Sequence, residues 1–201
     1  MIFNFGKYNG KSIEEIYKKD PSYINFLLSK PWFEKKYPDI FKECKNIYIK
    51  NIKIDNNKLY IYTDGACPNN GRKNSKCGIG IHFSNDIEDI SEKLDIEEPT
   101  NNKAELIAIL KALEKIDGID KDIEIYSDSK YSINCIEVWY PNWIKENKLK
   151  DKKNIDIIEK IYPLYKKNNI KFNHIYAHTN KGDIHSIGNS IADKLATDIL
   201  K

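Results

Sequence analysis

The sequence contains no long apolar run, and this absence narrows the class of protein first. No hydrophobic segment approaches the roughly 20 residues that a membrane-spanning helix needs. The N-terminal stretch MIFNFGKYNGK also lacks the apolar centre of a secretory signal peptide. We therefore expect an intracellular protein, cytoplasmic or nuclear, that is neither secreted nor inserted in a membrane.

Cysteine is scarce and is not arranged for a zinc site or a disulfide framework. The four cysteines form no C-x-x-C pair: Cys44, Cys67, Cys77 and Cys135. Internal repeats and low-complexity tracts are absent as well, so a repeat array is excluded. Reduced thiols in a cytosol-like compartment are expected.

A strong net charge is also absent, because the whole chain carries only +3. Its distribution is more informative. Residues 1–58 hold 12 lysines against 7 acidic residues, whereas the rest holds 21 basic against 23 acidic side chains. The basic excess therefore lies near the N-terminus, and the larger part is mildly acidic.

Residues 1–50 predict a small, mainly helical and basic module. Ser12 with Glu15 three residues later is typical of a capping box that begins a helix. Pro21 is suited to the first position of a second helix. Residues 46–58 alternate loosely, and we interpret them as a linker or an extra strand.

From residue 58 to residue 201 the pattern predicts a second, α/β domain. Strands and helices follow one another in the order β–β–α–β–α–α–β–α, which is typical of a sheet with helices packed on it. The expected strands cover 59–65, 78–84, 122–129 and 170–178, and the expected helices cover 100–116, 129–140, 154–166 and 188–200.

Four acidic residues stand at the ends of expected strands or near the starts of expected helices, where catalytic or metal-binding side chains can lie. Asp64 and Asp128 each follow an apolar strand, at the edge of a sheet where α/β proteins bind ligands. Glu105 lies one turn into a helix, and Asp193 lies near the start of the last one. Taken singly, each acid is explained by a turn, a cap or a solvated face, so the case depends on their joint context.

That context resembles ribonuclease H of type 1. The resemblance covers roughly residues 58–200, and the motifs that carry it follow the family's order: Tyr62-Thr63-Asp64-Gly65-Ala66, Thr100-Asn101-Asn102-Lys103-Ala104-Glu105-Leu106, Ser127-Asp128-Ser129-Lys130-Tyr131 and Gly188-Asn189-Ser190-Ile191-Ala192-Asp193-Lys194-Leu195-Ala196. It implies a mixed five-stranded sheet flanked by helices.

The resemblance also implies a catalytic, metal-binding cluster of four carboxylates: Asp64, Glu105, Asp128 and Asp193. Clustered carboxylates raise one another's pKa values unless cations neutralise them. Mg²⁺ prefers such oxygen ligands, and a pair of ions about 4 Å apart suits displacement at phosphorus. The implied reaction cuts the RNA strand of an RNA–DNA hybrid internally, leaving 5′-phosphate and 3′-hydroxyl ends, with Mn²⁺ as an alternative metal.

A histidine belongs before the last acid in this family. His178 directly follows a strand and matches that position, with Ala177 in place of the usual glycine. The loop that follows is about five residues longer than usual, so His185 stays open as the alternative. His174 has an ordinary explanation, since it alternates with Phe172 on a strand and is expected to pack or cap.

Several side chains lie where the family contacts its substrate. Asn70, Asn101, Lys130 and Asn189 could read the 2′-hydroxyl or a phosphate across the minor groove. Lys130 departs from the glutamine often found there, which favours a phosphate contact. Asn70 also suits a simple turn, and Asn101 suits a helix cap.

Trp139 and Trp143 match the family's tryptophan-containing helix, which grips the DNA strand. The lysines that follow resemble a shortened basic protrusion: Lys145, Lys148, Lys150, Lys152 and Lys153. The tryptophans suit the hydrophobic core equally well, so both roles stay open.

The N-terminal module resembles a small module that is fused to exonucleases and other nucleic-acid enzymes. The resemblance rests on Phe5-Gly6-Lys7-Tyr8-Asn9-Gly10-Lys11-Ser12, Asp20-Pro21-Ser22-Tyr23 and Pro31-Trp32-Phe33. Binding of nucleic acid and binding of a protein are both open for it.

The sequence bears on three alternatives to a monomeric hybrid-cutting enzyme. A non-catalytic hybrid-binding protein would be favoured by loss of a carboxylate, but all four are present. A 3′–5′ exonuclease would begin with a D-x-E pair, and Asp64-Gly65-Ala66 lacks the glutamate. A ribonuclease H domain of a reverse transcriptase would require the chain to be a fragment.

Overall fold

The computed structural model describes residues 1–28, 30–51, 57–68, 70, 75–176 and 184–201. The chain divides into two compact units. The N-terminal unit comprises residues 1–55 with 178–187, and the sheet unit comprises residues 56–177 with 188–201. Within the described ranges no helix is both long and apolar enough to cross a membrane.

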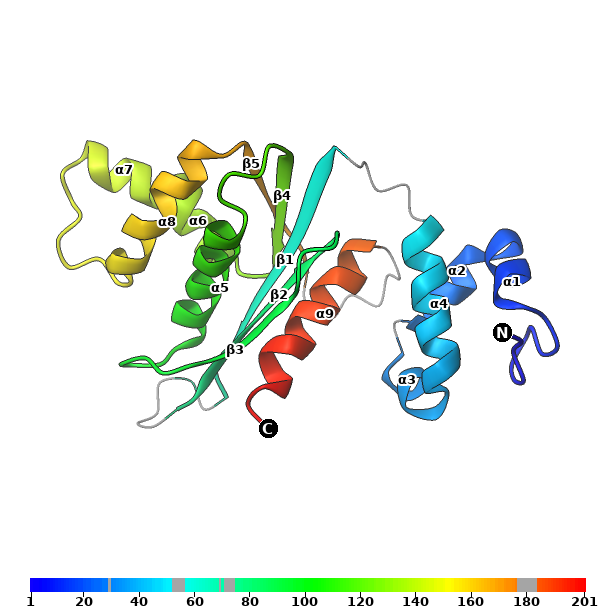
Figure 1. The fold of residues 1–201 in the computed structure, drawn as a ribbon. Helices are drawn as coiled ribbons and strands as arrows, with labels where there is room; N and C mark the ends of the chain where they lie inside the picture. The colour runs from blue at the N-terminus through cyan, green and yellow to red at the C-terminus, as the bar shows by residue number, and fades with distance from the viewer. Residues whose placement is uncertain (29, 52–56, 69, 71–74, 177–183) are drawn as a thin grey trace. The chain divides into compact units, whose positions relative to one another are not determined.

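The N-terminal unit is built from short helices (Figure 1). Their bounds are α1 Ile13–Lys19, α2 Pro21–Leu28, α3 Pro31–Lys36 and α4 Pro38–Asn51. The expected capping box at the start of α1 is confirmed, because Ser12 Oγ accepts from the Glu15 amide and the Glu15 carboxylate accepts from the Ser12 amide. Pro21 begins α2, as expected.

Helix α4 continues to Asn51, so the interpretation of residues 46–51 as linker or strand is wrong. Ile40, Cys44 and Ile47 are buried at helical spacing and pack in one cluster. This apolar stripe extends past residue 46 and favours helix over the loose alternation seen in the sequence.

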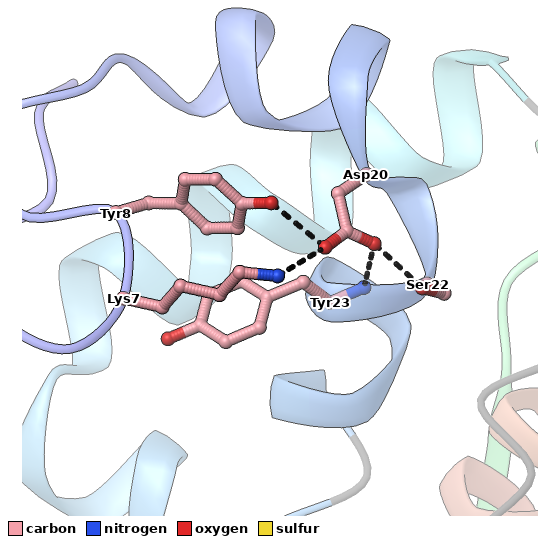
Figure 2. A network of polar contacts seen from close by, with 5 residues as sticks. All are labelled: Lys7, Tyr8, Asp20, Ser22 and Tyr23. Atoms are coloured by element: carbon pink, nitrogen blue, oxygen red, sulfur yellow. Dashed lines mark hydrogen bonds and ion pairs between the residues drawn. The ribbon is translucent and has the colours of Figure 1, made fainter.

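A polar network ties the start of the N-terminal unit to the start of α2 (Figure 2). The Asp20 carboxylate accepts hydrogen bonds from Lys7 Nζ at 3.2 Å, Tyr8 Oη at 2.8 Å, Ser22 Oγ at 2.6 Å and the Tyr23 amide at 3.2 Å. The bonds from Ser22, Tyr8 and Lys7 hold the pKa of Asp20 well below its usual range.

The sheet unit contains a mixed five-stranded sheet, which confirms the expected fold. The strands are β1 Lys58–Ala66, β2 Cys77–Phe83, β3 Ile90–Leu94, β4 Asp122–Ser127 and β5 Ile170–His174. Their spatial order is β3-β2-β1-β4-β5. The pairs β1–β2 and β2–β3 are antiparallel, and β1–β4 and β4–β5 are parallel.

Strand β3 was absent from the element order that the sequence pattern predicts. The strand has only five residues, ISEKL, most of which are polar, and all but Leu94 are exposed or half-buried. An edge strand with one solvated side carries few apolar residues, so its pairing with β2 rather than its composition defines it.

Helices cover both faces of the sheet (Figure 1). Their bounds are α5 Asn101–Lys115, α6 Lys130–Asn134, the π-helix η1 Cys135–Trp139, α7 Tyr140–Lys145, α8 Ile155–Lys167 and α9 Ile184–Asp198. Helix α5 packs on β1 and β2, and α8 packs on α5. Leu59 and Ile61 of β1 are fully buried in this core. Helix α9 belongs to the sheet unit from Gly188 onward.

Candidate active site

Asp64 lies near the end of β1, on the face of the sheet that α9 covers. It pairs with Gly80 of β2, and side chains of directly opposed residues share a face. A Cβ at Gly80 would clash with the backbone of Ala192 in α9, so glycine permits this close approach. The approach brings Asp193, the next residue of α9, near enough to raise the pKa of Asp64.

Glu105 is brought to the same place from the opposite face. Thr100 caps α5, its Oγ1 accepting from the Lys103 amide at 3.2 Å. A Cβ at Gly65 would clash with the backbone of Ala104 and Glu105, so this second glycine seats α5 directly against β1. Glu105 is consequently buried beside Asp64, although it belongs to a different element.

Asp128 completes the group from the neighbouring parallel strand. Ser127 of β4 pairs with Thr63 of β1, so the residues that follow them, Asp128 and Asp64, lie side by side. One carboxylate oxygen from each of Asp64, Glu105 and Asp128 lies within 4.8 Å of the other two.

The electrostatics of this cluster are unfavourable for bare carboxylates. Burial, followed by the charges of Asp128 and Asp193, raises the pKa of Asp64 to about 7. Burial, followed by the charges of Asp64 and Asp128, raises the pKa of Glu105 well above its ordinary value. Glu105 Oε2 is buried without a hydrogen-bond partner among the described residues. An all-oxygen, anionic set with an unsatisfied atom fits a hard divalent cation.

The structure describes two of the three histidines that the sequence brings near the expected site. His178 lies outside the described residues, and His185 lies half-buried in the first turn of α9. His174 is half-buried at the end of β5, where its Nε2 lies 3.2 Å from the backbone oxygen of Asp128. Since a carbonyl oxygen only accepts, His174 is the donor and steadies the segment that carries Asp128.

Two of the expected substrate residues lie together. The Asn70 Oδ1 accepts from the Asn101 amide at 3.0 Å, and both residues are exposed. Lys130 is exposed at the first position of α6. Asn189 is buried in α9, and its Oδ1 has no hydrogen-bond partner within the part of the chain that the structure describes.

Trp139 and Trp143 are half-buried, 6.3 Å apart between ring centroids, and both pack against the hydrophobic core. Lys152 Nζ lies 5.1 Å from the Trp143 ring. Trp139 ends the π-helix η1, a local widening that is frequent at functional sites. The structure thus gives both rings a packed side and an accessible side.

Sequence reasoning passed over Gly65 and Gly80, which decide how closely α5 and α9 approach the acids. Glycine inside a strand pattern was the signal that would have found them, because it marks close approach of another backbone. Buried Thr63 was also missed, and its Oγ1 has no partner among the described residues.

Comparison with known proteins gives two family matches. Residues 56–201 match the RNase H family, and residues 3–30 match the Exodeoxyribonuclease X-like C-terminal family. The second match agrees with the resemblance seen in the N-terminal sequence.

Individual relatives point the same way. The chain is 39% identical to the ribonuclease H of Schizosaccharomyces pombe over 142 residues, which is 68% of this chain and 50% of that protein. It is 39% identical to the ribonuclease HI of Rickettsia prowazekii over 145 residues, covering 69% and 88%. The chain thus spans about half the length of the first relative and most of the second.

A solved structure shares the fold. The solution structure of the RNase H domain of prototype foamy virus matches with a TM-score of 0.56 and 23% identity, covering 70% of this chain and 92% of that one. At that identity the likeness supports the architecture alone.

Proposed function

This chain belongs to the ribonuclease H family, and from that premise we propose that it is a metal-dependent endoribonuclease. Its substrate is the RNA strand of an RNA–DNA hybrid. The observation that carries the proposal is the convergence of Asp64, Glu105 and Asp128 within 4.8 Å, with Asp193 close to Asp64.

The four carboxylates are the proposed ligands of two Mg²⁺ ions, for which Mn²⁺ can substitute. When bound, the ions neutralise the cluster and stabilise negative charge that develops on the scissile phosphate. Support comes from the raised pKa of Asp64 and from Glu105 Oε2, because neither carboxylate has a counter-charge beside it among the described residues.

In the proposed reaction a water oxygen bonds to phosphorus and the bond from phosphorus to the 3′ oxygen breaks. The products are a 5′-phosphate and a 3′-hydroxyl. The carboxylates orient the phosphodiester, and His178 transfers protons, with His185 as the alternative. A histidine suits proton transfer because it titrates near neutral pH.

The substrate would be held by polar contacts on the RNA side and by rings on the DNA side. We propose that the Asn70 and Asn101 pair reads the 2′-hydroxyl across the minor groove and that Lys130 contacts a phosphate. Trp139 and Trp143 pack on DNA sugars through their accessible sides. Asn189 supports the site from α9, where its free Oδ1 faces no described donor.

We propose that residues 1–50 form a module separate from a catalytic domain at 58–201, and that this module binds nucleic acid. Most aromatic rings of the module form its core, but Phe26 is 50% and Trp32 is 48% exposed. Lys30 Nζ lies 4.6 Å from the Phe26 ring. Exposed rings beside a lysine suit nucleic acid, since rings stack on bases and lysines pair with phosphates.

Cleavage of end-labelled duplexes with and without Mg²⁺ tests the catalytic proposal. RNA–DNA hybrid, double-stranded RNA, double-stranded DNA and single-stranded RNA are compared side by side. Internal cuts confined to the RNA of the hybrid, abolished by a chelator, are expected. A protein that binds the hybrid but leaves its RNA intact in Mg²⁺ and in Mn²⁺ would be a binding protein instead.

The module is tested in the full chain by replacing Phe26 and Trp32 with alanine. Weaker hybrid affinity with unchanged turnover supports nucleic-acid binding. Unchanged affinity and unchanged salt dependence point to a protein partner or to a purely structural module.

A further inference from the structure

Tyr176 lies two residues beyond the end of β5 and is 65% exposed, more than any other large apolar or aromatic side chain in the described ranges. A side chain of this size is normally at least half-covered in a folded unit. Its exposure therefore calls for an explanation other than core packing.

The ring is nevertheless held in a defined place. His174 meets it edge-on, with ring centroids 5.0 Å apart and planes at 85°. Lys130 Nζ lies 5.6 Å from its centroid, within the range of a cation–π contact. These contacts limit the freedom of an exposed side chain, which lowers the entropy cost of binding something to it.

The same contacts connect Tyr176 to the carboxylate cluster. His174 donates to the backbone oxygen of Asp128, and Lys130 follows Asp128 by two residues. Two links therefore connect Tyr176 to the end of β4. One runs through His174 to the backbone of Asp128, and the other runs through Lys130, two residues further along the chain.

A purely structural role does not account for the arrangement. The end of β5 is already fastened to β4 by a backbone hydrogen bond from Ile175 to Ser127 at 3.0 Å. A ring that served only to fasten the two strands would gain its stabilisation by being buried, whereas this one leaves most of its surface in water.

We propose that Tyr176 is a substrate-contacting residue whose exposed ring packs on a backbone sugar of the hybrid near the carboxylate cluster. Lys130, at the neighbouring position, pairs with an adjacent phosphate. The identity of the ligand as nucleic acid rests on the proposed function. A contact to a backbone sugar carries no sequence information, as an enzyme that cuts hybrids of varied sequence requires.

The test measures binding without cleavage, in the full chain carrying Asp64→Asn. Fluorescence anisotropy with a labelled RNA–DNA hybrid compares this background with the added changes Tyr176→Ala, Tyr176→Phe and Ile199→Ala. Tyr176→Ala is expected to weaken affinity by about 5-fold or more, as truncation of an aromatic ring in a binding contact does. Tyr176→Phe is expected to stay within about twofold, because it keeps the ring face.

Ile199→Ala is the matched control, because Ile199 is an exposed apolar residue of the same unit with no proposed contact. It is expected to leave affinity unchanged. Tyr176→Leu repeats the test with a side chain that retains apolar bulk but has no ring, and it is expected to bind as weakly as the alanine variant.

Affinity equal to the background in Tyr176→Ala or Tyr176→Leu, with an unchanged melting temperature, would overturn the proposal. An equal loss in Tyr176→Phe would overturn the ring-face contact in favour of the hydroxyl. Cleavage by the unmodified chain is measured separately. Absent cleavage with ring-dependent binding therefore refutes the enzyme alone, and cleavage without ring dependence refutes the Tyr176 contact alone.

Discussion

The two units each contain a carboxylate in a crowded polar setting, and the settings are opposite. Asp20 in the N-terminal unit accepts four hydrogen bonds, one of them from a lysine (Figure 2). Asp64 in the sheet unit lies among three other carboxylates, and within the described part of the chain the Gly65 amide opposes the rise of its pKa.

This difference separates a structural carboxylate from one prepared for a ligand. The pKa of Asp20 is lowered because its partners stabilise the charged form, so the fold gains from its ionisation. The pKa of Asp64 is raised because burial and like charges disfavour ionisation. The second setting fits an added cation, whereas the first does not need one, so residue type alone does not distinguish the two settings.

The largest effect is expected on the rate of hybrid cleavage when Asp64 is replaced. Asp64→Asn is expected to reduce hybrid cleavage by about 10³-fold or more, as removal of a central catalytic group does. Asp20→Asn, the matched change in the other unit, should leave turnover unaltered within about twofold. Initial rates on a labelled hybrid check both. Normal cleavage by Asp64→Asn would refute the metal-cluster assignment.

The contrast between Asp64 and Asp20 also predicts how the free energy of unfolding depends on pH. Between pH 3.8 and about 7, folded Asp64 keeps a proton that the unfolded chain has lost. Without metal, the free energy of unfolding of the natural chain therefore falls as pH rises through this window. Asp64→Asn removes that loss and should be more stable at pH 8, by at most about 4 kcal/mol.

Urea unfolding in a chelator at pH 4 and pH 8 measures this effect. The two proteins should differ little at pH 4, where Asp64 is protonated in the folded state. Added Mg²⁺ should stabilise the natural chain more than the variant. A variant that is less stable than the natural chain at pH 8 without metal would contradict the origin of the raised pKa.

A substitution that adds side-chain volume without changing charge tests how α5 is positioned against the carboxylate cluster. Gly65→Ala places a methyl group against the backbone of Ala104 and Glu105, and it should cost roughly 1–3 kcal/mol of stability. The shift of α5 should also lower turnover under conditions where the variant remains folded. Denaturant unfolding and turnover are measured together, and unaltered values would show that α5 has room to move.

The smallest effect is expected at Asp20. Asp20→Asn should lower the melting temperature at neutral pH, because it removes the ionised acceptor of four donors. A lowered folded pKa gives stability that is present above the unfolded value of about 3.8 and is lost as pH falls through the folded value. The difference should therefore fade in acid. Glu14→Gln, an exposed carboxylate in α1, is the control.

Much of the fold was predictable from local signals. The capping box at Ser12 and the proline that begins α2 act within a few residues, so the sequence pattern locates them. The end of α4 and strand β3 were not predictable, because a buried stripe and an edge pairing depend on distant partners.

The candidate site divides in the same way. The four acids, the strand ends at which two of them stand and the family they resemble could all be predicted from the sequence alone. Three further features emerge only in the folded chain. Gly65 and Gly80 let helices approach from both faces, and His174 holds the backbone of Asp128. Glu105 Oε2 is buried with no hydrogen-bond partner among the described residues. Burial and like-charge proximity are properties of the assembled chain, and they raise the pKa values of Asp64 and Glu105 in the way that suits a cation site.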